Sequence, residues 1–176
     1  MARDTVRAAA AATAVAEVVV VTDDPRALQA LQGPGVRILP DSPRAGLNAA
    51  LRHAADSVLL DSEGEPDTSV AALSADLPAL RPAELDLALH TAAAYDRAFL
   101  ADAAGTGTVL LTATAGHELR PEYGPDSRRA HVASGAHDLT TEIGEQVPGL
   151  RRDVDTVADL SAATLLGTGP ATSSLH

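Results

Sequence analysis

The chain has 176 residues, of which 24 are acidic and 13 are basic, so its formal net charge at pH 7 is −11. This charge argues against nucleic acid or an anionic membrane as a partner. The absence of cysteine excludes disulfides, thiolate metal sites and a cysteine nucleophile, and the absence of lysine excludes a Walker-type phosphate loop and Schiff-base chemistry. The length suits one domain, and we expect residues 1–176 to fold as one.

The opening stretch is rich in alanine and could be mistaken for a signal peptide. Asp4 and Arg7 interrupt it, however, and alanine makes only a weak apolar segment. Alanine has the highest helix propensity of all residues, so we predict a helix that reaches about Ala16. The sequence contains no run of about 20 strongly apolar residues, as a membrane-spanning helix would require. We therefore expect a cytoplasmic protein.

The first third of the chain alternates apolar runs with turn residues. A β-branched run predicts a buried strand over Glu17–Thr22. Asp24, followed by proline, is typical of the N-cap of a helix, which we expect to reach Gln32. The elements predicted next are a strand over Val36–Leu39, a helix over Leu47–Ala55 and an acidic, turn-rich surface loop over Asp61–Ser69.

The same alternation continues to the end of the chain. Val70–Leu73 is predicted to be a buried strand that ends before Asp76, because Pro78 and Pro82 stop it and allow a helix to begin. The elements predicted next are a helix over Pro82–Tyr95, strands over Phe99–Ala101 and Thr108–Thr112, a helix over Asp126–Ser134, a strand over Gly149–Asp155, and a helix from the Thr156 capping box to Leu166. Strands that alternate with helices indicate an α/β fold with a mostly parallel sheet.

Three aspartates carry the clearest chemistry. Asp76 follows a predicted buried strand, at the edge of the sheet where open α/β folds bind ligands. Asp153 and Asp155 are two residues apart, so on a strand they would share one face. If the strand ends are neighbours, the three carboxylates form a cluster suited to Mg²⁺, and two such ions could clamp a phosphoryl transfer. The alternatives are that Asp76 only caps a turn or helix and that the other two lie in an exposed turn.

Three glycine-containing turns are candidate contacts for a phosphate or a nucleotide. Gly105–Thr108 can present backbone amides and hydroxyls to a phosphate. Gly124–Ser127 leads into a helix whose N-terminus could hold an anion. Gly46 and Asn48 open another helix, where the asparagine could read the edge of a base or a ribose. Each turn also has a purely structural interpretation as a plain turn or a helix cap.

The basic side chains near these turns give a weaker signal. Arg128 and Arg129 follow the second turn and could contact a phosphate, or they could simply be surface residues. The six histidines share no metal-ligand spacing, and we interpret His131 and His137 as surface residues. No metal site built on histidine is therefore expected.

Five motifs occur together in one order: G-L-N at 46–48, S-A-D-L-P-A-L at 74–80, G-T-G-T at 105–108, G-P-D-S at 124–127 and P-G-L-R-R-D-V-D-T at 148–156. Together they resemble the phosphoenolpyruvate and 2-phospho-L-lactate guanylyltransferases of deazaflavin coenzyme F-420 biosynthesis. The resemblance covers about residues 3–172. Five motifs in register are far more specific than any one of them.

The resemblance implies a nucleotidyltransferase-type α/β fold, a Rossmann-like three-layer sandwich. It implies the transfer of GMP from GTP to the phosphate of phosphoenolpyruvate or 2-phospholactate, with release of pyrophosphate. The chain looks most like the actinobacterial branch, which uses phosphoenolpyruvate. The residues implied to hold two Mg²⁺ in catalysis are Asp76, Asp153 and Asp155. The residues implied to contact the acceptor are Thr108, Gly124 and Ser127, and we take Gly46 and Asn48 as candidates for the nucleotide.

The chain departs from this family at its start. Relative to the family it lacks an opening strand and a lysine-containing nucleotide loop, so we expect weak turnover. An unpaired sheet edge would also favour a homo-oligomer. Two other functions are considered: a remnant that binds only a metal or phosphoenolpyruvate, and a receiver-like signalling domain with Asp76 as phosphoacceptor. The absence of lysine argues against the receiver.

Overall fold

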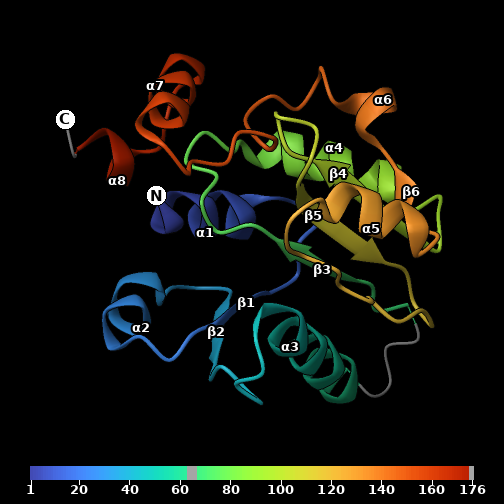
Figure 1. Ribbon diagram of the computed structural model, residues 1–176. Coiled ribbons are helices and arrows are strands. Elements are labelled where there is room, and N and C mark those ends of the chain that lie inside the picture. Colours follow the sequence, from blue (N-terminus) through green and yellow to red (C-terminus); the bar gives the residue numbers. More distant parts are fainter. Residues whose placement is uncertain (63–66, 175–176) are drawn as a thin grey trace.

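The computed structural model describes residues 1–62 and 67–174, and it confirms the α/β class (Figure 1). The elements in chain order are α1 (Ala2–Ala11), β1 (Val18–Val21), α2 (Pro25–Leu31), β2 (Val36–Leu39), α3 (Leu47–Asp61), β3 (Val70–Leu73), α4 (Pro82–Ala92), β4 (Arg97–Ala101), β5 (Thr108–Ala113), α5 (Ser127–Ala133), β6 (His137–Asp138), α6 (Thr140–Ile143), α7 (Val157–Leu166) and α8 (Pro170–Ser173). Every helix and strand predicted before residue 140 is present, although several ends differ by a few residues. The short elements β6, α6 and α8 were not predicted.

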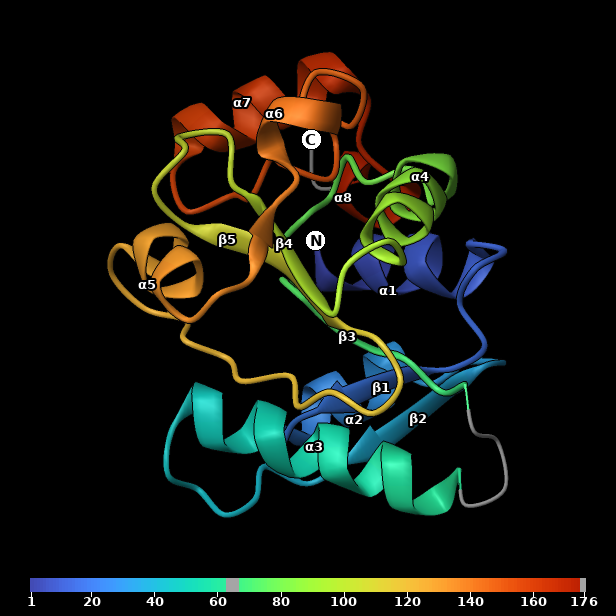
Figure 2. The same cartoon turned by 90° about the vertical axis from the view of Figure 1, so that its right-hand side faces the viewer.

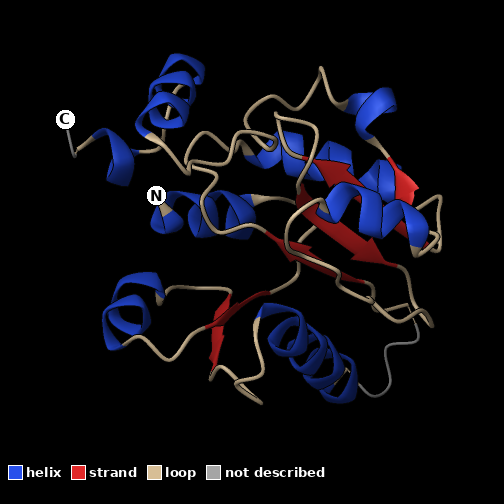
Figure 3. Ribbon diagram, viewed as in Figure 1, coloured by secondary structure: helices blue, strands red, loops and turns tan. Residues whose placement is uncertain are grey.

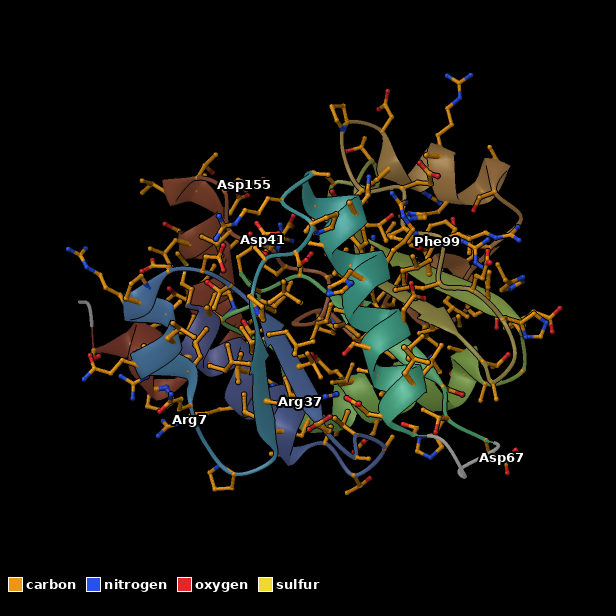
Figure 4. The ribbon with its side chains drawn as sticks, turned by 90° about the horizontal axis from the view of Figure 1, so that it is seen from below. Arg7, Arg37, Asp41, Asp67, Phe99 and Asp155 are labelled. Atoms are coloured by element: carbon orange, nitrogen blue, oxygen red, sulfur yellow. The ribbon has the colours of Figure 1, made fainter. Side chains whose placement is uncertain are left out.

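The first sheet consists of β1 and β2, which pair in parallel with Val18 opposite Val36. Arg37 on β2 connects this sheet to its surroundings (Figure 4). Its guanidinium lies 3.0 Å from the Glu17 carboxylate just before β1 and forms a second ion pair with Asp61, the last residue of α3. The two-stranded sheet is thereby joined to the helix that follows it.

The second sheet has the strand order β3-β5-β4-β6. The strand β5 runs antiparallel to both β3 and β4, whereas β4 and β6 are parallel. The strands β3, β4 and β6 therefore share one direction, and β5 is the exception to the mostly parallel sheet that we predicted. The cause is the connection between β4 and β5, residues 102–107, because a parallel crossover needs about a dozen residues or more.

The helix α3 packs against both β1 and β3, which belong to different sheets. Figure 2 shows it running beneath both strands. Within residues 1–62 and 67–174 the two sheets share no ladder of hydrogen bonds. The helix is therefore one of the elements that joins the two halves of the molecule.

Each face of the second sheet supports its own apolar cluster, because successive side chains of a strand point to opposite faces. On β4, Ala98 and Leu100 belong to the cluster beneath α4, whereas Phe99 belongs to the cluster on the opposite face. Figure 2 shows α4 and α5 on either side of β4 and β5. Phe99 is the one aromatic residue among the buried members of the two clusters in the described part of the chain. Helix, sheet and helix thus form three layers.

The helix α1 holds the last turns of the chain in place. The Asp4 carboxylate accepts hydrogen bonds from the backbone N–H groups of Ala171 at 2.9 Å and Thr172 at 2.6 Å, in α8. The neighbouring Thr5 Oγ1 accepts a hydrogen bond from the Leu77 N–H at 3.0 Å, just after β3. As a result, α1 fixes both α8 and the turn that follows β3.

One predicted strand is absent. Residues 149–155 form turns and an extended segment rather than a strand (Figure 3). In place of a backbone ladder, the Arg151 side chain donates to the carbonyl oxygens of Ala101 and Asp102 at the end of β4, and the Arg151 carbonyl accepts from the Ala103 N–H at 2.8 Å. Of the predicted acidic loop, Asp61 belongs to α3 and residues 63–66 lie outside the described residues. No helix in the described ranges is long and apolar enough to cross a membrane.

Candidate active site

The turn after β3 presents Asp76. The Ser74 N–H donates to the Val109 carbonyl at 2.9 Å, which extends the pairing of β3 with β5 by one residue. The residues that directly follow Asp76 are apolar and buried, and the first of them, Leu77, donates its N–H to Thr5 Oγ1. Asp76 itself is half-buried. The backbone on both sides is fixed, so the carboxylate has a defined position at the carboxyl edge of the sheet.

The segment that carries Asp153 is packed against this same edge. At Gly149 a Cβ atom would lie 2.2 Å from the Ala79 carbonyl oxygen, so only glycine fits there. Two residues later, the Arg151 guanidinium donates to the Asp102 carbonyl at 2.7 Å. These contacts bring Asp153 toward the ends of β3 and β4 without a strand. We predicted Asp153 at this edge because we expected it on a strand, but the segment that carries it is not a strand.

The acids are close enough to change one another's pKa values. Burial, and next the charge of Asp102, raises the pKa of Asp153 to about 6, and Asp76 and Asp155 contribute further repulsion. Burial raises the pKa of Asp76, and the charge of Asp155 adds to this. Asp155 itself is exposed and lies just before α7 (Figure 4). The three predicted acids therefore share one electrostatic environment.

Asp102 is a fourth acid of this cluster, which the sequence analysis missed. It is buried and directly follows β4, much as Asp76 follows β3. Its carboxylate accepts hydrogen bonds from the N–H groups of Thr106 at 3.0 Å and Gly107 at 2.8 Å. These two amides of the glycine-threonine turn are thus engaged by the protein itself. The available signal was that Asp102 is a lone acid directly after a buried strand.

The chemistry of these donors fits Mg²⁺. Burial and the charges of nearby acids raise the pKa values of Asp76 and Asp153, and a bound divalent ion would stabilise both charged carboxylates. Among the described residues, no three aspartate, glutamate or histidine side chains are already placed to hold one ion together. Mg²⁺ commonly takes one or two protein carboxylates and completes its shell with water and substrate phosphates. The cluster therefore suits an ion that arrives with a phosphate ligand.

Thr108 and Ser127 lie on elements that face each other. Thr108 begins β5 and Ser127 begins α5, and both are buried. They meet at His131, which lies one turn further along α5 and whose Nδ1 is 2.9 Å from Thr108 Oγ1. His131 is fully buried, so our interpretation of it as a surface residue was wrong. Gly124 is exposed at φ 147°, in the turn that precedes α5.

Gly46 and Asn48 lie at the start of α3, and the structure connects them to this turn. The Asn48 amide donates to the Tyr123 carbonyl at 2.9 Å and accepts from the Tyr123 N–H at 2.8 Å. Gly46 has φ 91° and precedes a helix start that no side chain caps. These two bonds hold Asn48 beside Tyr123, the residue that precedes Gly124.

The two arginines after this turn differ in their surroundings. The Arg128 guanidinium pairs with Asp138 at 2.9 Å and donates to the Gly105 carbonyl at 3.0 Å. It therefore holds the glycine-threonine turn onto α5 and β6, and its donors are not directed at a ligand. Arg129 is exposed.

Comparison with known proteins places this chain in a family. The family model of the MobA-like NTP transferase domain matches residues 1–145. The phosphoenolpyruvate guanylyltransferases of Streptomyces scabiei and Streptomyces avermitilis are 55% and 56% identical over 175 and 171 residues, which cover 97% of this chain and 78% and 76% of theirs. The Thermomonospora curvata protein of the same name is 51% identical over 175 residues, which cover 99% of this chain and 74% of that protein. The chain belongs to the phosphoenolpyruvate guanylyltransferase family.

A solved structure shares the fold of this guanylyltransferase-family chain. It is a protein from Desulfovibrio desulfuricans G20 predicted to be a nucleotide-diphospho-sugar transferase. The TM-score is 0.55 at 15% sequence identity, and the match covers 93% of this chain and 80% of the other. At this identity the likeness concerns the nucleotidyltransferase-type fold alone.

Proposed function

We propose that the protein transfers GMP from GTP to the phosphate of phosphoenolpyruvate, with Mg²⁺ as cofactor, in coenzyme F-420 biosynthesis. The observation that carries the proposal is the cluster of Asp76, Asp102, Asp153 and Asp155 at the carboxyl edge of the sheet, with raised pKa values for Asp76 and Asp153. A reaction between two polyanionic substrates requires divalent cations, and uncompensated carboxylates attract them. The names of the related proteins support phosphoenolpyruvate as the acceptor.

In this reaction a phosphate oxygen of the acceptor attacks the α-phosphorus of GTP, and pyrophosphate leaves. No covalent intermediate with the protein is needed, so alignment and charge neutralisation account for most of the catalysis. Asp76 and Asp153 would hold Mg²⁺ from the protein side, with Asp155 at the rim. When bound, the ion neutralises phosphate oxygens of both substrates.

The acceptor would bind between β5 and the start of α5. The hydroxyls of Thr108 and Ser127 are two polar groups on these elements that a phosphate or carboxylate could use, and the open turn at Gly124 can approach the ligand with its backbone. The nucleotide would lie toward Gly46 and Asn48, which the Tyr123 backbone connects to the same turn.

An end-point assay for pyrophosphate tests the proposal. Purified protein is incubated with GTP, Mg²⁺ and, separately, phosphoenolpyruvate, 2-phospholactate or 3-phosphoglycerate. We expect release with phosphoenolpyruvate above the other two acids, and none when EDTA replaces Mg²⁺. Absence of release with every acid would contradict the proposal. Calorimetry would then identify a remnant, which binds phosphoenolpyruvate or a metal without turnover.

A further inference from the structure

His131 is enclosed on all sides near the proposed acceptor site. It is 0% exposed and lies four residues after Ser127 on α5, so the two side chains share one face of the helix. Its ring centroid is 5.7 Å from that of Phe99 and 5.3 Å from that of Tyr123, which meets it edge-on. A ring held this tightly keeps one orientation, so the partners of its two nitrogens are fixed.

The partner of one nitrogen determines where the ring proton lies. The Glu122 backbone N–H donates to Nε2 of His131 at 3.0 Å, so Nε2 must keep its lone pair and carries no proton. Burial, and next the charge of Arg97, lowers the pKa of His131, whereas the Glu122 charge and a hydrogen bond to the Ser127 backbone oppose this. The ring is therefore neutral at pH 7, and its single proton is on Nδ1.

The second nitrogen contacts Thr108. With its proton on Nδ1, His131 donates to Thr108 Oγ1 across 2.9 Å and shares this proton with the Ser127 backbone. Thr108 then acts as the acceptor in this bond, and its own hydroxyl proton is left for another partner. No other hydrogen bond of this hydroxyl occurs within residues 1–62 and 67–174. The hydroxyl can therefore donate to an incoming ligand.

This polarity matches an anion. A phosphate or carboxylate oxygen accepts hydrogen bonds, and bonds to a charged acceptor are about twice as strong as neutral ones. With the proton on Nε2 instead, Thr108 would donate to Nδ1 and turn its lone pairs toward the anion, which would repel it. We propose that His131 is a positioning residue that makes Thr108 a hydrogen-bond donor to the phosphate or carboxylate of the acceptor. The inference rests on the proposed function, because it assumes that this acid binds at Thr108.

The proton position can be measured without any activity. A long-range ¹H–¹⁵N NMR spectrum of the uniformly labelled protein distinguishes the two neutral forms of each histidine, and the His131→Gln variant assigns the signal. We expect the Nδ1–H form for His131 between pH 6 and pH 8. The Nε2–H form, which predominates in free imidazole side chains, would overturn the inference.

Two variants separate donation by His131 from mere packing. The amide nitrogen of asparagine can occupy the position of Nδ1, whereas the amide of glutamine reaches the position of Nε2. We expect His131→Gln to weaken binding of phosphoenolpyruvate about tenfold, as loss of one charge-assisted bond should. His131→Asn should stay within about threefold of the wild type. The affinity for GTP should not change in either variant.

Thr108 supplies the remaining test. In the Thr108→Val background, His131→Gln should cause no further loss of phosphoenolpyruvate affinity, because the group that it positions is absent. An additional tenfold loss there, or equal losses in the glutamine and asparagine variants, would overturn the inference. Affinities come from calorimetry and turnover from pyrophosphate release, so the two proposals fail separately. If the protein releases pyrophosphate but His131 is in the Nε2–H form, only the role of His131 is refuted. If His131→Gln selectively loses affinity for phosphoenolpyruvate but the protein releases no pyrophosphate, only the proposed function is refuted.

Discussion

Two aspartates from opposite parts of the chain have opposite pKa shifts, although folding removes water from both. At Asp4, burial raises the pKa, but hydrogen bonds from Thr172 and Ala171 outweigh it and the pKa falls below its ordinary value. At Asp153, burial is joined by the charges of other acids, and the pKa rises to about 6. The fold therefore supplies donors to the acid it uses for structure, whereas at Asp76 and Asp153 no donor outweighs burial and the charges of neighbouring acids. An unbalanced charge of this kind is typical of a functional site.

The largest expected effect comes from removing a charge of the acidic cluster. Asp76→Asn and Asp153→Asn should each lower guanylyl transfer about 100-fold or more, because each removes a carboxylate that we propose as a ligand of the divalent ion. Pyrophosphate release with GTP and phosphoenolpyruvate measures this loss. The control is Asp56→Asn, the same change at an exposed position on α3, which should leave the rate unchanged. Full activity of both cluster variants would contradict the assignment of the site.

The compensated aspartate should affect stability. Asp4→Asn should lower the free energy of unfolding at pH 7 by about 2 kcal/mol, because two buried backbone N–H groups lose a charged acceptor. The folded-state pKa is lowered, so this stabilisation is complete above the ordinary value of 3.8 and is lost as the pH falls through the folded-state pKa. Urea unfolding at pH 7 and at pH 3 measures the difference. An equal loss at both pH values would show that the charge of Asp4 is not the cause.

The same contrast explains how much of the fold could be predicted from the sequence. Local chemistry was sufficient to predict the start of α2, where Asp24 caps the helix by accepting a hydrogen bond from the Arg26 N–H at 2.8 Å. It was also sufficient for α7, where Thr156 and Asp159 form the predicted capping box. Each of these depends on residues near in sequence. The reversal of β5 against β4 could also have been predicted from the short connection 102–107. The pairing of β5 with β3 depends on which strands become neighbours, and no local pattern contains that information.

The site was predictable to the extent that its residues follow strands. Asp76 was chosen as a candidate because it follows an apolar run, and Asp102 could have been chosen in the same way. The contacts of Asn48 could not be predicted, because its partner Tyr123 lies 75 residues further along the chain. His131 was judged by its polarity alone, and its burial depends on Phe99 and Tyr123, which only the tertiary structure brings to it.

The smallest expected effect has the opposite sign to that of Asp4→Asn. Because folding raises the pKa of Asp153 from 3.8 to about 6, the folded state holds this proton more tightly than the unfolded state does. The free energy of unfolding therefore falls as the pH rises from about 4 to about 6, and the cost remains at higher pH. Asp153→Asn removes that cost. It should stabilise the protein at pH 8 by about 1 kcal/mol, a value reduced from the full shift because the group is partly exposed to solvent.

Urea unfolding in EDTA at pH 4 and pH 8 tests this last prediction, with the chelator present so that no bound ion offsets the repulsion. The variant and the wild type should be equally stable at pH 4 and differ at pH 8. A variant that is less stable at pH 8 would show that Asp153 makes a favourable contact when charged, and the contrast with Asp4 would be wrong. The expected result is a variant that is more stable at pH 8 but inactive. It would show that the repulsion among these acids lowers stability and is kept for function.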